Sequence, residues 1–249
     1  MTDSNQTTNT MHWTDHLGEL RKRVVWTLVI FVLSFIAGFY FVEEIYFFME
    51  NDVPFKLTVI SPFEIIWIYI IIATVTALIV TVPFFALQLW LFISPGLTKK
   101  ERRISILYIP VIFILFIGGL AFGYFFIKDL ILGFLLNLGE GLVNEMFTAA
   151  NYFRFILQIT IPFALFFEVP LIAMFLTSLG ILEPSLLKRV RKFAYIILVI
   201  LGTMLSPPDF ILQLFVVGPL IALYEIAIFA SSAIYKRQLK KIEKLSASS

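Results

Sequence analysis

Four clusters of basic residues divide this chain, and the sequence between them is almost entirely apolar. Sixteen of the 19 lysines and arginines belong to these clusters, which are Arg21-Lys22-Arg23; Lys99, Lys100, Arg102 and Arg103; Lys188, Arg189, Arg191 and Lys192; and Lys236, Arg237, Lys240, Lys241 and Lys244. Lysine and arginine are enriched in the cytoplasmic loops of membrane proteins. Four clusters on one side of a bilayer require an even number of crossings between each pair. The pattern therefore predicts an integral membrane protein with both termini in the cytoplasm.

The remaining charged residues support this orientation. The segments assigned to the outer face contain three basic residues, Lys56, Lys128 and Arg154, against nine acidic ones. The inner face contains sixteen basic residues against six acidic ones. A formal net charge of only +2 therefore conceals a strong asymmetry across the predicted membrane.

Composition excludes several classes of protein. At 60% hydrophobic residues, the chain could not cover its surface with polar groups as a soluble globule. Its basic residues flank apolar segments, so anionic lipid is a better candidate partner than nucleic acid. The sequence has no cysteine, which excludes disulfides and thiol chemistry. The first ten residues are polar and lack an apolar signal-peptide region, so we expect no removable signal peptide.

The apolar runs predict an all-α integral membrane fold with six transmembrane helices. They are continuously apolar, without the alternation of a membrane β-barrel, and most approach the length that crosses a core of ~30 Å. The predicted spans are 24–42, 65–93, 104–127, 153–179, 193–205 and 210–232. We therefore expect a cytoplasmic N-terminal segment over 1–23, a six-helix membrane domain over 24–232 and a basic cytoplasmic tail over 233–249.

The segment before the first span has two interpretations. Trp13, Leu17, Leu20 and Val24 recur at helical spacing. This pattern fits a short amphipathic helix lying on the inner membrane surface. It fits equally well a helical extension of the first span, and the residues alone leave both open.

Two features predict an irregular helix arrangement. Prolines interrupt four of the six spans, and each removes a backbone donor and bends its helix, which favours a curved wall over a straight bundle. These prolines are Pro83, Pro110, Pro162, Pro170 and Pro219. The fifth span, Phe193–Leu205, is also short, at roughly 20 Å for its 13 residues. A short hairpin of this kind would thin the bilayer locally, which suits a protein that moves large polar cargo.

Motifs of enzymes and metal sites are missing. The sequence contains no nucleophile elbow, no metalloprotease His-Glu-x-x-His motif and no phosphate-binding Gly-x-x-x-x-Gly-Lys loop. His12 and His16 have a spacing that suits a metal, but no convincing third ligand accompanies them, so we interpret them as surface residues. We therefore expect no enzymatic activity and no cofactor.

Two acidic residues lie inside apolar spans. Glu168 is near the middle of the fourth span, where an ionisable group costs at least ~2.5–3.5 kcal/mol to insert and usually has a function. Pro170 cannot donate to the carbonyl of Phe166, which leaves another polar group close to Glu168. Glu225 lies nearer the inner end of the sixth span, with Lys236 and further cations within reach, so snorkelling is the competing interpretation.

Acidic residues within the basic clusters suggest a binding site. Glu101 lies between Lys100 and Arg102, and Glu19 lies beside Arg21. Neutralisation of a basic loop is the ordinary role of such a residue. The alternative is a carboxylate that captures a guanidinium through a charge-assisted, bidentate hydrogen bond.

Four motifs resemble the TatC family, the multispan subunit of the twin-arginine protein translocase. The motifs are His16-Leu17-Gly18-Glu19-Leu20-Arg21-Lys22-Arg23; Gln88-Leu89-Trp90-Leu91-Phe92-Ile93-Ser94-Pro95-Gly96-Leu97 with Glu101-Arg102-Arg103; Phe167-Glu168-Val169-Pro170; and Ser206-Pro207-Pro208-Asp209. They occur in order and with fitting spacing, and the similarity extends from about residue 12 to 235. The combination is highly specific.

The resemblance implies a six-helix, glove-like receptor that binds the twin-arginine signal peptides of folded cargo. It implies signal-peptide contacts at Glu19, Phe92, Leu97 and Glu101, and it places Glu168 on the concave face. By the same resemblance, Thr203, Ser206 and Gln213 form a patch where a partner subunit docks.

The implied partners are single-span TatA-type subunits, with or without a separate TatB-type subunit, together with membrane lipid and further copies of the chain. The resemblance also implies a bacterial cell membrane and transport powered by the proton-motive force. The alternative function is a proton-coupled secondary transporter that uses Glu168 and Glu225 as a relay. Such carriers usually contain internal repeats, and this sequence shows none.

Overall fold

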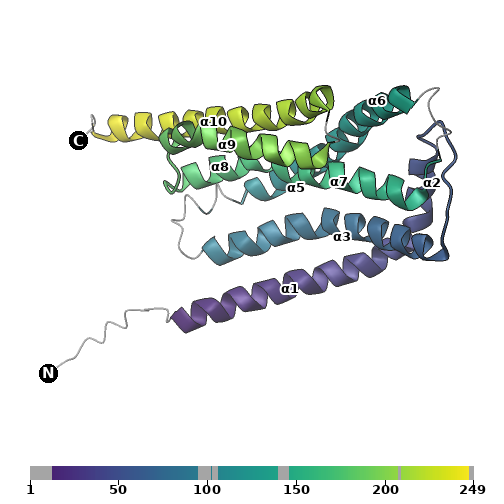
Figure 1. Ribbon diagram of the computed structural model, residues 1–249. Helices are drawn as coiled ribbons and strands as arrows, with labels where there is room; N and C mark the ends of the chain where they lie inside the picture. Colours follow the sequence, from purple (N-terminus) through teal and green to yellow (C-terminus); the bar gives the residue numbers. More distant parts are fainter. Residues whose placement is uncertain (1–12, 95–101, 103–105, 140–145, 207–208, 247–249) are drawn as a thin grey trace.

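A computed structural model describes residues 13–94, 102, 106–139, 146–206 and 209–246, with the backbone alone for 13–17 and 241–246. The described residues are almost entirely helical (Figure 1). In chain order the helices are α1 (Trp13–Tyr40), α2 (Val42–Glu50), α3 (Pro62–Ile93), α5 (Tyr108–Phe122), the π-helix η2 (Gly123–Lys128), α6 (Asp129–Gly139), α7 (Ala149–Phe167), α8 (Val169–Ser178), α9 (Pro184–Leu205) and α10 (Phe210–Ser246).

The long helices lie side by side, so the molecule has two distinct ends. Helix α2 and the segments around residues 51–61 and 146–148 lie at one end, at the right of Figure 1, which we call the cap end. The beginnings of α1 and α9 and the ends of α3 and α10 lie at the other end. This end carries the described members of all four basic clusters, and we call it the basic end.

Five helical segments are long and apolar enough to cross a membrane, within the part of the chain that the structure describes. They are Gly18–Tyr40, Pro62–Ile93, Tyr108–Gly139, Ala149–Ser178 and Phe210–Lys240. The fifth expected span lies within α9, which is a helix of 22 residues. Its first turns hold the basic cluster from Lys188 to Lys192, so only its second half is continuously apolar.

The predicted end of the third span is wrong. The predicted span ends at Ile127, and Lys128 is expected on the outer face. In the structure α5, η2 and α6 continue as one helical segment to Gly139. The lysine does not end the helix because its charge is paired inside the fold.

The start of the chain also resolves an open alternative. Helix α1 runs without interruption from Trp13 to Tyr40. The segment before the first span is therefore an extension of that span, and a separate amphipathic helix is not formed. The predicted span began at Val24, whereas α1 begins at Trp13.

Two loops are hydrogen-bonded to each other at the cap end. The backbone N–H of Thr58 donates to the carbonyl of Phe147 at 3.0 Å, and the N–H of Ala149 donates to the carbonyl of Thr58 at 2.9 Å. The rings of Phe55 and Phe147 stack with their centroids 4.1 Å apart. Ser61 and Thr148 cap the N-termini of α3 and α7 through their side-chain oxygens. The starts of these two helices are therefore held at the same level.

Helix α7 packs very closely against the segment formed by α5 and η2. A Cβ atom at Gly119 would lie 2.6 Å from the Cα of Ala164, and one at Gly123 would lie 2.8 Å from the Cα of Thr160. Only glycine allows backbones to approach this closely, as is common between membrane helices. The two apolar cores of the molecule both include residues of α7, such as Ile156 and Phe163.

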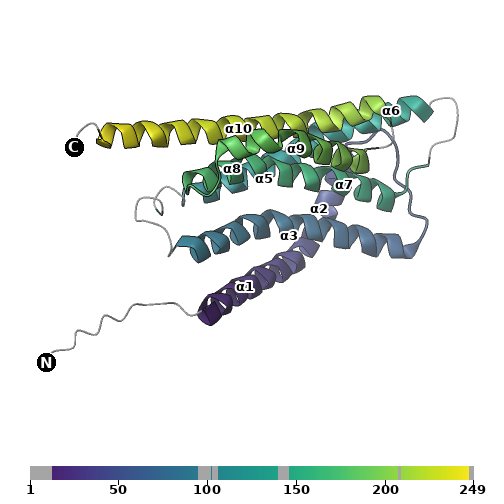
Figure 2. The ribbon, with the colours of Figure 1, turned by 60° about the vertical axis from the view of Figure 1, so that its left-hand side comes forward.

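Helices α9 and α10 form a hairpin with arms of unequal length, 22 residues in α9 and 37 in α10. Its turn stops short of the cap-end limits of α3 and α6 in both ribbon views (Figures 1 and 2). Gly202 packs against the side chain of Val217, where a Cβ would meet Val217 Cγ2 at 2.3 Å. Asp209 caps α10 by accepting from the N–H groups of Ile211 and Leu212. The sequence predicted a short hairpin. Helix α9 is not among the five segments of the described chain that are long and apolar enough to cross a membrane, whereas α10 contains such a segment, Phe210–Lys240, so the prediction fails for that arm.

Candidate functional site: a basic-end crevice and an unpaired glutamate

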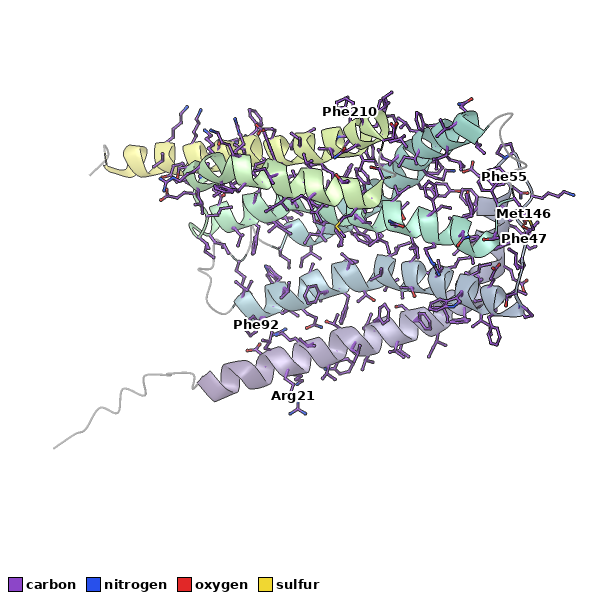
Figure 3. The ribbon with its side chains drawn as sticks, viewed as in Figure 1. Arg21, Phe47, Phe55, Phe92, Met146 and Phe210 are labelled. Atoms are coloured by element: carbon purple, nitrogen blue, oxygen red, sulfur yellow. The ribbon has the colours of Figure 1, made fainter. Side chains whose placement is uncertain are left out.

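A narrow crevice separates α1 from α3 at the basic end. Its lining residues are Leu20, Arg23, Val24 and Thr27 of α1, and Phe85, Gln88, Leu89 and Phe92 of α3. Figure 3 shows Phe92 near the basic end of α3, while Arg21 points away from the bundle. Two of the residues expected at the signal-peptide site are therefore close together, because Phe92 lines the crevice and Glu19 contacts Arg23 at its edge.

Arg23 connects the two walls of the crevice. It donates through Nε to Oε1 of Glu19 at 3.2 Å, and its Nη2 forms an ion pair with the same oxygen. Its Nη1 donates to Oε1 of Gln88 on α3 at 3.3 Å. The Glu19 side chain is 29% exposed, and no hydrogen bond to its Oε2 is found among the described residues. Glu19 therefore has one oxygen engaged and one facing a partly open site.

The sequence analysis missed the roles of Arg23 and Gln88. It paired Glu19 with the neighbouring Arg21, although the i, i+4 spacing of Glu19 and Arg23 is the spacing that brings side chains together on a helix. Gln88 stood within a recognised motif, but its contact with α1 depends on how two helices pack.

The remaining signal-peptide candidates fall in the loop after α3. Leu97 and Glu101 lie outside the described residues, so their positions relative to Glu19 stay a prediction. Next to them, the Arg102 guanidinium lies 5.8 Å from the centroid of the Trp90 ring, at the end of α3. This contact is a cation–π interaction between Arg102 and the basic end of α3.

Glu168 lies at a break in the fourth long helical segment. It is the single residue between α7 and α8, and Pro170 begins the second helix. The Glu168 side chain is buried, at 6% exposure, and neither carboxylate oxygen has a hydrogen-bond partner within the described chain. An unpaired carboxyl group inside a membrane protein is costly to keep, so its presence indicates a function.

Glu225 has a different environment. Its Oε2 accepts a hydrogen bond from Nη2 of Arg191 at 2.9 Å, and its Oε1 accepts one from the hydroxyl of Tyr195. The expected neighbour was Lys236, but the partner is a member of the third basic cluster on α9. A carboxylate held by an arginine and a tyrosine has a structural role between α9 and α10. This arrangement weakens the transporter alternative, which needs both glutamates as a relay.

The three residues expected at the docking patch lie at the turn between α9 and α10. Gln213 donates through Nε2 to the hydroxyl of Thr203 at 2.6 Å on the exposed surface. Ser206 is buried, and its hydroxyl donates back to the carbonyl of Gly202, so it does not contribute to the surface. Gln158 of α7, which the sequence analysis did not identify, donates to the carbonyl of Met204 at 3.1 Å. The exposed polar surface is therefore formed by Thr203, Gln213 and Gln158.

The buried ion pairs of Lys128 could not be predicted from the sequence. Its side chain is fully buried and forms ion pairs with Asp52 and with Asp129 at the cap end. Its Nζ also lies 4.3 Å from the centroid of the Tyr124 ring. Burial raises the pKa of Asp52, but the Lys128 ammonium and the Tyr124 hydroxyl outweigh this effect, and the net pKa is lowered.

The described residues contain no group of three or more His, Cys, Asp or Glu side chains arranged to hold a metal ion.

Comparison with known proteins agrees with the motifs and the fold. The family model described as "Sec-independent protein translocase protein (TatC)" matches residues 15–219. The chain is 42% identical over 230 residues to the Sec-independent protein translocase protein TatCd of Bacillus subtilis, which covers 92% of this chain and 95% of that one. It is 39% identical over 240 residues to the TatC protein of Halalkalibacterium halodurans, with 93% and 92% covered.

A solved structure supports the same conclusion. The crystal structure of the twin-arginine translocase receptor TatC superimposes with a TM-score of 0.77 at 30% sequence identity, covering 88% of this chain and 99% of that one. These relatives are transport proteins and not enzymes, and they are multispan membrane proteins. The chain belongs to the TatC family of Sec-independent protein translocase proteins.

Proposed function

We propose that this protein binds the twin-arginine signal peptides of folded cargo at the basic end, along the outer edge of the crevice between α1 and α3. The supporting observation is the Glu19 carboxylate, which is 29% exposed, has Oε1 held by Arg23 and leaves Oε2 without a partner among the described residues. A guanidinium of the peptide would donate to this free oxygen, while Glu101 supplies a second carboxylate from the adjoining loop. Phe92 and Leu97 provide apolar contacts beside the charged groups.

Arg23 has a specific part in this proposal. It holds Glu19 in the orientation that leaves Oε2 open, and its bond to Gln88 fixes the carboxylate relative to α3. Because the pair is partly exposed, it is worth little to the fold, and its geometry adjusts at low cost when a peptide arginine arrives.

The orientation is part of the proposal. Both termini and the basic end face the cytoplasm, since lysine and arginine are retained on that side. Helix α9 is then the fifth span, shielded by longer neighbours, and the wall that contains Glu168 forms the concave face of a glove-like structure. Reporter fusions after Arg103 and Lys192 should read cytoplasmic, and fusions near Asp52 and Asp209 should read external. An external reading at Arg103 would contradict the six-span arrangement.

The exposed polar pair Gln213–Thr203 is the proposed docking point for a TatA-type or TatB-type single-span subunit. It lies among exposed apolar side chains, including Met204 at 69% and Phe210 at 80% exposure. A polar residue on a partner helix would find hydrogen-bonding groups there that lipid does not provide. Gln213→Leu should therefore reduce recovery of that subunit with the purified protein, while Leu214→Ile on the same helix should not. The proposal includes more than one copy per complex and transport powered by the proton-motive force.

The decisive experiment is site-specific crosslinking of a synthetic twin-arginine peptide to the purified protein. Loss of a charge-assisted hydrogen bond of roughly 1.5–3 kcal/mol in Glu101→Ala should weaken peptide binding by about 10- to 150-fold. Glu101→Asp should be intermediate, and Glu101→Lys should bind least. Glu183→Ala is the matched control, because Glu183 is another exposed acid at the basic end. Unchanged crosslinking in folded Glu101→Ala protein would remove Glu101 from the site and leave Glu19 as the remaining carboxylate.

A further inference from the structure

A cavity lies between α2, α3, α5 and α7, away from the basic-end crevice. Its volume is about 340 Å³. The walls include Met49 of α2, Val75 and Ile79 of α3, Ala121 of α5 and Ile156 of α7. Almost all of its surface is hydrocarbon, contributed by isoleucine, leucine, valine and phenylalanine side chains.

Two threonine hydroxyls near this cavity are engaged by helix carbonyls, and the buried hydroxyl of Tyr124 has no hydrogen-bond partner among the described residues. The hydroxyl of Thr76 donates to the carbonyl of Ile72 at 3.0 Å, and that of Thr160 donates to the carbonyl of Ile156 at 2.8 Å. Buried water needs two to four polar partners, and a smaller engineered cavity of about 150 Å³ lined by apolar side chains stays dry and binds apolar molecules. The chemistry of this cavity therefore suits an apolar occupant.

The cavity opens onto the apolar outside of the helix bundle. Three of its lining residues are also exposed, Phe48 and Phe125 at 60% each and Ile117 at 36%. These residues belong to or adjoin membrane-spanning segments, so the opening faces the hydrocarbon of the bilayer. A molecule that enters from this side comes from the lipid and not from water.

The dimensions of the cavity match a single lipid chain. Along α3 it extends from Ile71 to Ile79, which is roughly 12 Å at 1.5 Å per residue. Half of a hydrocarbon core of ~30 Å is about 15 Å, so the cavity spans most of one leaflet. The volume of about 340 Å³ is spread along that length, so the cavity is an elongated channel.

Polar and charged side chains of the cap end lie at one end of the cavity. Met49 and Tyr124 line it there, and the ion pair of Lys128 with Asp52 lies directly beside Tyr124. Aromatic and charged side chains of this kind lie at the headgroup region of a bilayer. A chain that enters between Phe48 and Phe125 would have its ester group at this level and its methyl end near Ile79.

We propose that this cavity is a lipid-binding site that holds one acyl chain of a phospholipid from the leaflet on the cap side. The bound chain fills space between α3, α5 and α7, and it contributes to the packing of the wall that these helices form. The site is independent of the proposed recognition of twin-arginine peptides, because its lining shares no residue with the basic-end crevice.

Photolabelling tests this proposal directly. The full-length protein is reconstituted into vesicles of phosphatidylglycerol and phosphatidylethanolamine that contain a phospholipid with a diazirine on one acyl chain, and the labelled residues are mapped by mass spectrometry after illumination. Ile156 is the diagnostic position, since it lines the cavity but is only 4% exposed. Leu28 on α1 is 61% exposed and serves as the internal standard for surrounding lipid. The expected result is label at both positions.

Two substitutions fill the cavity from opposite walls, and one matched substitution does not. Val75→Phe on α3 and Ala121→Phe on α5 should remove the label at Ile156 and leave the label at Leu28. Val80→Phe, also on α3 but 48% exposed and outside the cavity, should keep both labels. After delipidation in detergent, added phospholipid should raise the unfolding temperature of the wild type and of Val80→Phe, and should not raise that of the two filled variants.

Other results would overturn the proposal. An unlabelled Ile156 in the wild type would show that no acyl chain enters. Equal labelling of Ile156 in the wild type and in both filled variants would place the label elsewhere. Recovery of a peptide instead of a lipid with the purified protein, seen as an added mass in native mass spectrometry, would assign the cavity to a different occupant.

Discussion

The two ends of this molecule hold their charged groups in opposite ways. At the cap end, Lys128 is completely buried, lies over an aromatic ring and pairs with Asp52 and Asp129. At the basic end, Arg23 and Glu19 of α1 remain 19% and 29% exposed, and Arg23 also donates to Gln88 of α3 across a narrow crevice. The cap end also has backbone hydrogen bonds between distant loops, through Thr58 and Phe147.

This difference separates stability from binding. Lys128 is expensive to leave unpaired because its ammonium is fully buried, whereas its partners Asp52 and Asp129 are 39% and 58% exposed and stay in contact with water. A partly exposed pair contributes only a few tenths of a kcal/mol to stability, since water replaces either partner readily. The cap end is therefore suited to fixing the fold, and the basic end is suited to exchanging an internal arginine contact for one with a ligand. Glu168 lies between them, buried like the cap residues but without a partner.

The largest expected effect on stability is at Lys128. Lys128→Ala removes both ion pairs and leaves a void in the cap end, and it should lower the free energy of unfolding by about 2–4 kcal/mol. Denaturant or thermal unfolding of the purified protein in detergent measures this change. Lys56→Ala is the control, because Lys56 is exposed in the loop at the same end. It should change stability by less than about 0.5 kcal/mol. Equal losses in both variants would show that the cap end does not depend on its buried charge.

At Glu168, an apolar substitution should preserve the stability of the fold and impair export. Glu168→Leu removes an unpaired buried carboxyl group, so the fold should be unchanged or more stable by about 1–2 kcal/mol. We expect this variant to lose most export of a twin-arginine cargo, while Glu168→Gln, which retains hydrogen-bonding capacity, keeps a substantial part. Export assays and unfolding of both purified variants measure the two quantities. If Gln and Leu abolish export equally, the charge or its proton is needed, and the relay alternative gains support.

The smallest expected change in stability is at Glu19. Glu19→Ala breaks an i, i+4 ion pair and should cost about 0.3–0.5 kcal/mol of unfolding free energy. Its effect on crosslinking to a twin-arginine peptide should be much larger, at about tenfold or more. Glu43→Ala provides the comparison, since Glu43 is an acidic residue of the cap end that should alter neither measurement strongly. Normal peptide binding by Glu19→Ala would assign recognition to the loop around Glu101 alone.

Several parts of the fold followed from local features of the sequence. Spans such as Pro62–Ile93 could be predicted because a long apolar segment has few stable states other than a membrane helix. The break at Glu168 could be predicted as well, since Pro170 removes a donor from the helix whatever surrounds it. The TatC motifs identified the family, and the comparisons confirmed it.

Other parts depended on contacts between distant segments. Asp52 and Lys128 are 76 positions apart, and a lysine at the end of an apolar run looks like a loop residue until its partners are known. The same is true of Glu225, whose partner Arg191 comes from the preceding helix, and of Gln88, which meets Arg23 across the crevice. Leu97 and Glu101 lie outside the described residues, so their place in the site remains a prediction.

The sequence by itself determined the presence of five long apolar segments, their helical form, the family and the end of the molecule that carries positive charge. Hydrophobicity, proline and charge act locally, and they can be evaluated one segment at a time. Only the tertiary structure decided which charges are paired, which carboxyl group is left alone and where an apolar cavity remains. Those outcomes depend on the free energy of burying a group beside particular neighbours, and the neighbours come from helices that are far apart in the chain.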